Sequence, residues 1–206
     1  MGKIALCMIV KDEDADRLAM LCDFVQPVVD QIVIADTGSE NNQIELYNTW
    51  KNVTAFNHPW GDSFADARNS TLQHLDSDIE WVLRLDTDEQ PSMGMMYHME
   101  GVKNSPMKGQ PLGWQYFSVN YWAGELGPEE PYHWHCHLFQ RKHGRWYKPV
   151  HEGVELKGQP EHVSMARGWM IHAPREAYLI HAKPLKHFER ANTLYPSLMP
   201  GAGPRN

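Results

Sequence analysis

The stretch Trp81–Glu89 (WVLRLDTDE) consists of an apolar run followed by a cluster of acidic residues, and we take it as the central element of the fold. Its apolar part has the length and composition of a buried β-strand, and it stops abruptly at Asp86. If the backbone stays extended, Asp86 and Asp88 point to the same side of the sheet. Open α/β sheets bind ligands at the carboxyl ends of their strands. Two carboxylates there suit Mg²⁺ or Mn²⁺, which would hold the phosphates of a nucleotide. The alternative is an acidic turn that only keeps a strand end soluble.

The composition is that of a globular protein with one domain. Hydrophobic residues make up 42% and charged residues 22% of the 206 positions, so the chain can bury a full core. The formal net charge of −7 argues against binding a nucleic-acid backbone over the whole surface. Three widely spaced cysteines imply no disulfide framework, and neither a basic leader nor an apolar run of about 18 residues occurs. We therefore expect a soluble, cytoplasmic protein without a transmembrane segment.

Apolar runs and helical patterns alternate through the first half of the chain. Strands are predicted before the central one over Lys3–Val10, Val28–Ala35 and Val53–Phe56. Apolar residues at three- and four-residue steps predict helices between them, over Arg17–Val25, Asn41–Trp50 and Asp62–Leu75. In the second half, two further strands are predicted over Gly113–Tyr121 and Tyr132–Phe139. The alternation predicts an α/β protein with a mostly parallel central sheet flanked by helices.

Two positions in the first half carry polar residues where ligands could bind. Asp36 and Gly38 lie in the turn after the second predicted strand, where aspartate satisfies backbone amides and glycine can adopt a positive φ. On the third predicted helix, Arg68 lies next to the apolar stripe rather than opposite it, which is unusual for an idle surface residue. The alternative for Arg68 is a surface ion pair with Asp66 or Asp62.

Several short motifs occur in the order and at the spacing of a known family. They are MIVKDE at 8–13, IADTGS at 34–39, FADARN at 64–69, LDTDE at 85–89, LFQR at 138–141 and VHE at 150–152. With them the chain resembles glycosyltransferase family 2, and within it the subgroup of the SunS-type and lipopolysaccharide-core transferases. The chain departs from the family at Asp12, where asparagine is common.

This resemblance implies a single domain with the GT-A (Rossmann-like) α/β fold over residues 1–199. A nucleotide-binding half would cover residues 1–90 and an acceptor-side half residues 109–199, with a tail at 200–206.

The resemblance also implies a metal-dependent glycosyltransferase that moves a sugar from a nucleotide-sugar donor, a UDP-sugar above others, with inversion. Mn²⁺ or Mg²⁺ would neutralise the charge that builds on the departing diphosphate. In the family, the residue matching Asp88 binds the metal directly, while the residue matching Asp86 lies against the ribose or reaches the metal through water. Asp36, with Gly38 in the same turn, would hold the base or ribose. Arg68 would lie near the nucleotide.

The segment Tyr147–Glu152 (YKPVHE) carries the candidate catalytic residue of the second half. The resemblance puts Glu152 beside the donor sugar, where an ionised carboxylate can accept the proton of the acceptor. His151 would orient Glu152 or the metal. The alternative for Glu152 is a surface residue or a residue at the start of a helix.

Histidines supply two further candidates for metal binding. His181 follows an isoleucine beyond the last predicted strand, where family members commonly supply a metal-ligating histidine, and His172 is the second candidate. In a strand, His133, His135 and His137 would share one face, and three imidazoles can bind zinc. A His-rich strand that faces a polar cleft explains this pattern equally well.

Functions of other classes stay open. The chain can be a nucleotide-sugar-binding protein without turnover, or a zinc protein built on the strand with His133, His135 and His137. A nucleotidyltransferase is a weaker rival, because no Gly-rich phosphate loop follows the first strand. The acceptor is open among a protein, a glycan and a nucleobase.

Overall fold

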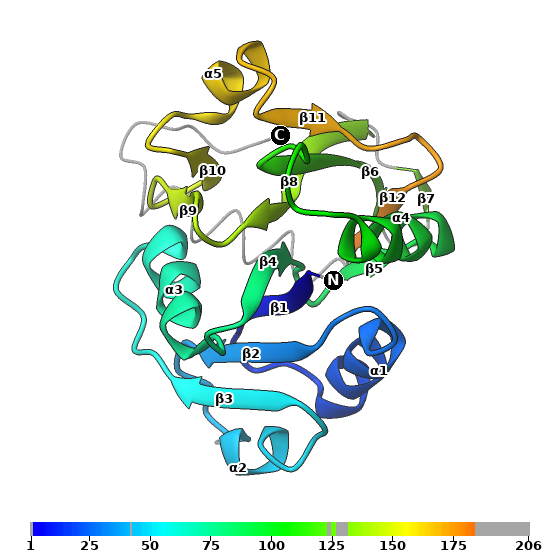
Figure 1. Cartoon of the computed structure of the whole chain (residues 1–206). Helices are drawn as coiled ribbons and strands as arrows, with labels where there is room; N and C mark the ends of the chain where they lie inside the picture. Colours follow the sequence, from blue (N-terminus) through cyan, green and yellow to red (C-terminus); the bar gives the residue numbers. More distant parts are fainter. Residues whose placement is uncertain (1, 42, 123–124, 127–131, 184–206) are drawn as a thin grey trace, which may run out of the picture.

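A computed structural model describes residues 2–41, 43–122, 125–126 and 132–183 of the chain. A large mixed sheet runs through the molecule, and helices cover both of its faces (Figure 1). The predicted α/β class is therefore confirmed. Expectations for the tail at 200–206 lie outside the described residues.

The first half of the chain forms the parallel part of the sheet. Its strands are β1 (Lys3–Val10), β2 (Gln31–Asp36), β3 (Val53–Asn57) and β4 (Ile79–Arg84), in the spatial order β3-β2-β1-β4. Every pairing among these four strands is parallel. The crossover helices are α1 (Ala15–Val25), α2 (Ile44–Tyr47) and α3 (Phe64–Thr71), the last extended by a 3-10 turn, η1 (Leu72–His74). The predicted elements of this half are all present, although α2 is much shorter than the pattern at 41–50 indicated.

The second half continues the same sheet with mixed strand directions. The order goes on from β4 through β8 (Tyr132–Gln140), β6 (Gly113–Trp122), β12 (Tyr178–Lys183) and β5 (Glu89–Pro91). Two short strands, β7 (Glu125–Leu126) and β11 (Met170–His172), also pair with β6. A separate antiparallel hairpin consists of β9 (Gly144–Tyr147) and β10 (Gly153–Leu156). Antiparallel pairing of β8 with both β4 and β6 makes this part of the sheet mixed, whereas the sequence indicated a mostly parallel sheet.

Two helices, α4 (Met93–Asn104) and α5 (Glu161–Ala166), were not predicted from the sequence. The Ser92 side chain caps α4 by accepting a hydrogen bond from the Met95 amide at 3.1 Å. The helix buries Met95, Met99 and Val102 against the sheet. Methionine adapts to irregular gaps, so these residues cover a curved sheet face without a regular pattern of branched side chains.

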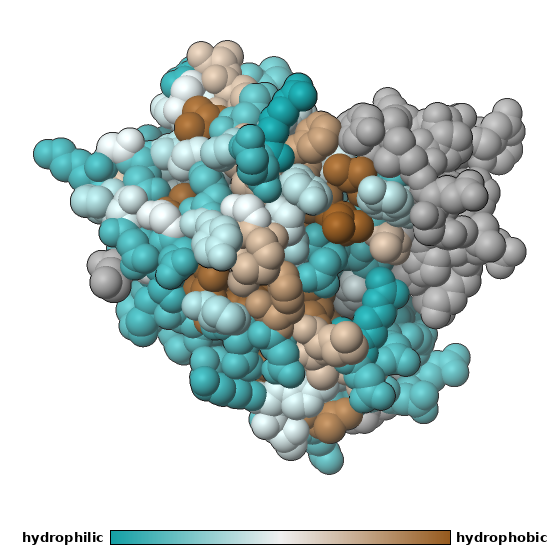
Figure 2. Space-filling model, turned by 90° about the vertical axis from the view of Figure 1, so that its right-hand side faces the viewer, coloured by the Kyte–Doolittle hydropathy of each residue, from teal (hydrophilic) through white to brown (hydrophobic). Residues whose placement is uncertain are grey.

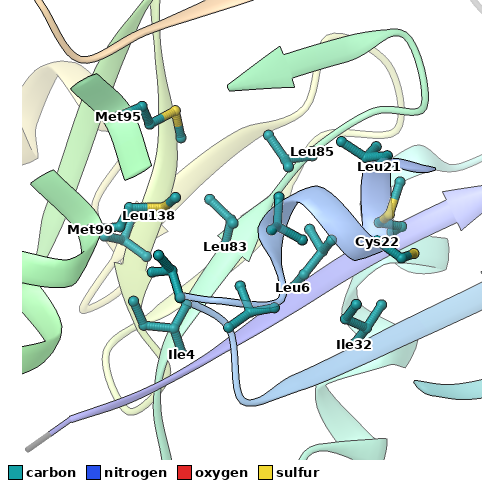
Figure 3. Packing of buried hydrophobic residues seen from close by; sticks show 14 of the residues in the cluster. Ile4, Leu6, Leu21, Cys22, Ile32, Leu83, Leu85, Met95, Met99 and Leu138 are labelled. Atoms are coloured by element: carbon teal, nitrogen blue, oxygen red, sulfur yellow. The ribbon is translucent and has the colours of Figure 1, made fainter. Parts of the chain in front are cut away.

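The core has two parts, one on each face of the sheet. On one face, Leu6, Ile32 and Leu83 of the parallel strands pack with Leu21 of α1 and Met99 of α4 (Figure 3). On the other face, the side chains of α3 and of the β9–β10 hairpin pack against the sheet. The surface in Figure 2 is mainly hydrophilic, with apolar residues in small groups. Within the described part of the chain, no helix is both long and apolar enough to cross a membrane.

The acidic end of the central strand differs from its predicted conformation. The strand β4 ends at Arg84, and the following residues turn into β5 rather than staying extended. The turn is closed by two hydrogen bonds between Asp86 and Glu89. The Glu89 amide donates to the Asp86 carbonyl at 3.0 Å, and the Asp86 amide donates to Glu89 Oε2 at 2.8 Å. The strand alternation that was expected to align Asp86 with Asp88 is therefore wrong, because the backbone reverses between them.

The backbone of α4 approaches the segment before β12 closely at Gly94. A Cβ atom on Gly94 would collide with the backbone carbonyl of Glu176, which cannot rotate away. We expect Gly94→Ala to lower the free energy of unfolding by about 2 kcal/mol, measured by urea denaturation. Gly101→Ala on the same helix is the matched control, because its Cβ would meet open space. Gly101→Ala should stabilise the protein by about 0.5 kcal/mol. Equal effects of the two substitutions would contradict this packing.

Candidate active site

The candidate site lies where the parallel strands end. Asp36 is the last residue of β2, and Asp86 and Asp88 follow β4 two strands away. Asp36 is almost fully buried, and its Oδ1 accepts hydrogen bonds from the amides of Gly38 at 2.9 Å and Ser39 at 2.8 Å. Gly38 has a φ of 110°, a conformation that favours glycine. The turn predicted at Asp36 and Gly38 is therefore formed, and its aspartate is held rigidly at the edge of the sheet.

Four charged side chains form a closed group beside this edge, which we call the charge ring: Arg68, Arg84, Asp86 and Glu152. Arg68 Nη2 contacts Asp86 Oδ1, and Arg68 Nε donates to Glu152 Oε1 at 2.7 Å. Arg84 Nη2 donates to Asp86 Oδ2 at 2.7 Å and lies 3.7 Å from Glu152 Oε1. Both oxygens of Asp86 are therefore bound by an arginine. Arg68 pairs with Asp86 and Glu152, so the alternative of a surface ion pair with Asp66 or Asp62 is wrong.

The pKa values in the charge ring follow from the balance between burial and the two guanidinium groups. Burial alone would raise the pKa of Asp86, but Arg68 and Arg84 outweigh it and hold that pKa well below its usual range. The same balance lowers the pKa of Glu152. Both carboxylates are therefore ionised at neutral pH, and the charge ring carries two positive and two negative charges.

The neighbouring residue of Arg68 anchors the hairpin that brings Glu152 to the site. Asn69 of α3 bonds the backbone of Trp146 on β9 in both directions, at 2.8 and 3.0 Å. The Phe64 amide donates to the Pro149 carbonyl at 2.9 Å, which ties the turn after β9 to the start of α3. His151 in that turn is exposed, with a φ of 52°. The fold thus brings Glu152 into the charge ring and leaves the adjacent His151 ring at the surface.

Asp88 and His181 meet outside the charge ring. His181 Nε2 lies 3.2 Å from Asp88 Oδ2, and the Ala182 amide donates to the Asp88 carbonyl at 2.9 Å. Two neighbouring ligands of an octahedral ion with bonds of about 2.1 Å lie about 3 Å apart. The pair therefore fits two positions around Mg²⁺ or Mn²⁺. His172, the second candidate, is exposed, and its ring lies 4.2 Å from that of Trp134 between centroids, tilted by 51°.

The histidines of β8 do not form a zinc site with the described residues. The rings of His133 and His135 are 4.5 Å apart at their centroids, and His135 and His137 are 6.4 Å apart. His137 is fully buried, and its Nδ1 lies 3.0 Å from the Arg84 carbonyl oxygen. In the described part of the chain, no three His, Cys, Asp or Glu side chains converge as metal ligands. The three-imidazole zinc site is therefore not supported.

Two residues beside the site were not assigned roles from the sequence. Arg84 interrupts the apolar run WVLRL, and a charged residue inside a buried strand is a signal that could have identified it. Glu89 is buried, and burial together with the Asp86 carboxylate raises its pKa to about 7. No local sequence pattern predicted that Glu89 would form hydrogen bonds with Asp86 and close this turn.

The fold and the position of this site are those of α/β proteins that bind ligands at the carboxyl edge of their parallel strands. The model of the family described as glycosyl transferase family 2 matches residues 7–118. The chain belongs to this family. A search of curated protein sequences finds no match.

Solved structures confirm the GT-A-like fold. One is glucosyl-3-phosphoglycerate synthase from Mycobacterium tuberculosis with Mn²⁺, UDP-glucose and phosphoglyceric acid. It has a TM-score of 0.53 and 13% identity, over 96% of this chain and 79% of that one. The same enzyme with Mn²⁺, UDP and phosphoglyceric acid has a TM-score of 0.53 and 12% identity, over 99% and 85%. A crystal structure described as a mycobacterial protein has a TM-score of 0.48 and 13% identity over 89% of this chain. The chain spans only 66% of that protein. At these identities the likeness shows the fold alone.

The lowered pKa of Asp86 predicts how stability depends on pH. A carboxylate with a depressed folded-state pKa contributes stability that is present above its unfolded pKa of about 4 and is lost as the pH falls. We expect Asp86→Asn to lower the free energy of unfolding by about 3 kcal/mol at pH 7, because it leaves two buried arginines short of a negative charge. The difference from wild type should shrink below about pH 4.

Urea denaturation between pH 7 and pH 3 measures this difference. Asp23→Asn, at an exposed position of α1, is the matched control and should stay within about 0.5 kcal/mol of wild type at every pH. A destabilisation by Asp86→Asn that is the same at pH 7 and pH 3 would show that charge pairing is not its cause.

Proposed function

We propose that the protein is a divalent-metal-dependent glycosyltransferase that moves a sugar from a UDP-sugar to an acceptor with inversion. The observation that carries this proposal is the Asp88–His181 pair, which offers two metal ligands at the sheet edge beside Asp36 and the charge ring. The glucosyl-3-phosphoglycerate synthase structures hold Mn²⁺ with UDP or UDP-glucose on the same fold, which supports this choice of donor and metal.

The residues of the site divide between binding and chemistry. Asp88 and His181 would hold the metal, which when bound neutralises charge on the diphosphate. Asp36 and the turn at Gly38 would hold the ribose or base, and Arg68 would lie beside the diphosphate. Asp86 would reach the metal only through water or lie against the ribose. His151 would orient Glu152 or the metal.

Glu152 is the proposed general base. In an inverting transfer, the acceptor oxygen attacks the anomeric carbon, its proton moves to a carboxylate, and the bond to the diphosphate breaks. The Glu152 side chain is 9% exposed and ionised, so it can accept that proton. Its bond to Arg68 makes it a weaker base than a free glutamate.

Other features of the proposal come from the sequence motifs. We propose that the domain covers residues 1–199, with its nucleotide-binding half at 1–90. The motifs FADARN and VHE favour the SunS-like and lipopolysaccharide-core subgroup. A protein, a glycan or a nucleobase is the acceptor in this proposal.

One observation favours a second function. Both Asp86 and Glu152 are engaged by arginines inside the protein, which is compatible with a nucleotide-sugar-binding protein that has no turnover. Release of UDP from UDP-glucose in the presence of Mn²⁺ and without an acceptor distinguishes the two functions. Only a transferase with a working site hydrolyses the donor slowly.

Glu152→Gln tests the general base. The substitution preserves shape and hydrogen-bonding atoms but removes the group that accepts a proton. We expect the rate of UDP release to fall by about 100-fold or more, while the affinity for UDP stays within about threefold of wild type. Glu155→Gln on the same hairpin, where the glutamate pairs with exposed Arg145, is the control and should turn over normally. Undiminished UDP release in Glu152→Gln would remove the assignment.

Asp88→Asn and His181→Ala test the metal ligands. In wild type, UDP with Mn²⁺ should raise the melting temperature, because ligands that bind the folded state stabilise it by mass action. Each variant should lose most of the part of this shift that depends on Mn²⁺. The control is His172→Ala, which should respond like wild type, because His172 is exposed on another strand and its ring contacts Trp134. A Mn²⁺-dependent shift that survives in both variants would place the metal elsewhere.

A further inference from the structure

The hydrogen-bonding groups of Asp86 are occupied within the protein. Its two carboxylate oxygens are bound by Arg68 and Arg84, its amide donates to Glu89, and its carbonyl accepts from the Glu89 amide. Each carboxylate oxygen can accept two bonds, but a cation bound directly to Asp86 would lie beside two guanidinium groups, and the repulsion between these positive charges weakens such binding. Of the two aspartates in the motif, Asp88 is the one that lies within 3.2 Å of a second possible metal ligand, the imidazole of His181.

The metal site that remains is incomplete on the side of the protein. Mg²⁺ and Mn²⁺ favour six ligands, and the described residues bring only two to the same point. The other positions would be filled by water or by phosphate oxygens of a bound nucleotide. The charge ring does not strengthen the attraction for a cation, because its two arginines balance its two carboxylates.

We propose that Arg84 is a positioning residue that keeps Asp86 away from the metal, so that the metal binds tightly only together with a nucleotide diphosphate. This inference rests on the proposed function and adds a role for a residue that the family motif does not include. Among the described residues, free metal would meet two ligands, Asp88 and His181. A metal ion that arrives with a diphosphate brings its own oxygen ligands. Metal and nucleotide then strengthen each other's binding by the same factor.

Arg84 is a better position than Arg68 for testing this role. Arg68 donates to Glu152 at 2.7 Å, whereas Arg84 approaches Glu152 only to 3.7 Å. The buried Nε of Arg84 has no hydrogen-bond partner among the described residues, so replacing this side chain breaks few bonds besides the one to Asp86. Arg84→Gln therefore frees Oδ2 of Asp86, while Arg68 still holds Oδ1 and keeps its bond to Glu152.

The experiment measures Mn²⁺ binding to the protein alone, by calorimetric titration with manganese chloride, in wild type, Arg84→Gln, Asp86→Asn and the double variant. We expect Arg84→Gln to bind Mn²⁺ on the order of tenfold more tightly, because a positive charge is removed and one oxygen of the Asp86 carboxylate is freed. Asp86→Asn should change the affinity by less than about threefold, and the gain from Arg84→Gln should disappear in the Asp86→Asn background. Arg84→Lys keeps the charge and should resemble wild type.

The inference is overturned if Arg84→Gln binds Mn²⁺ no more tightly than wild type, or if its gain persists without the Asp86 carboxylate. Melting curves check that each variant is folded. If Arg84→Gln fails to fold, the comparison of Asp86→Asn with Asp88→Asn still shows whether Asp86 is kept away from the metal. Asp88→Asn should weaken Mn²⁺ binding by about tenfold or more, and an equal loss in Asp86→Asn would show that Asp86 already binds the metal.

A second titration, with UDP present, separates this inference from the proposed function. Wild type should bind Mn²⁺ more tightly with UDP, and this enhancement should be smaller in Arg84→Gln, because its site is already more complete. If UDP has no effect on wild type, the proposed donor fails, whereas the comparison of variants with Mn²⁺ alone still tests Arg84. If UDP strengthens Mn²⁺ binding equally in both proteins, the role of Arg84 fails and the proposed function stands.

Discussion

The arrangement of the site depends on two arginines, one buried and one partly buried, that hold two carboxylates between them. Arg68 comes from a crossover helix and Arg84 from the central strand. Asp86 comes from the turn after that strand and Glu152 from the loop that joins β9 to β10. Removing one member would leave an uncompensated charge away from water, which is why such groups hold their elements in one arrangement. The charge ring therefore joins the parallel half of the sheet to the hairpin.

This constraint gives the two aspartates of the motif different tasks. Asp86 is taken up by the arginines and by the turn that Glu89 closes, so it serves the architecture of the site. Asp88, on the other side of the turn, lies against His181, which belongs to β12, the strand that pairs with β5. The separation follows from a backbone reversal of a few residues. A strand that continued straight would have put both carboxylates in one environment.

Much of the fold was predictable, for a physical reason that differs between the two halves. Strands β1, β2 and β4 are buried and helices α1 and α3 are amphipathic, so apolar runs and helical periodicity identified them within a few residues. Helix α4 escaped prediction because its methionines and glycines do not give a distinctive periodic pattern. The antiparallel pairing of β8 escaped as well, since strand direction depends on contacts between distant segments and leaves no mark in local composition.

The sequence by itself determined the class of fold, the family and a small set of candidate site residues, because these depend on local patterns of polarity and on short motifs. The tertiary structure decided which partner each of those residues has. Arg68 and Glu152 are 84 positions apart in the chain, and no local pattern shows that they share a hydrogen bond. The ionisation of a carboxylate and its ability to bind a metal depend on such partners, since charges interact through space and not along the chain.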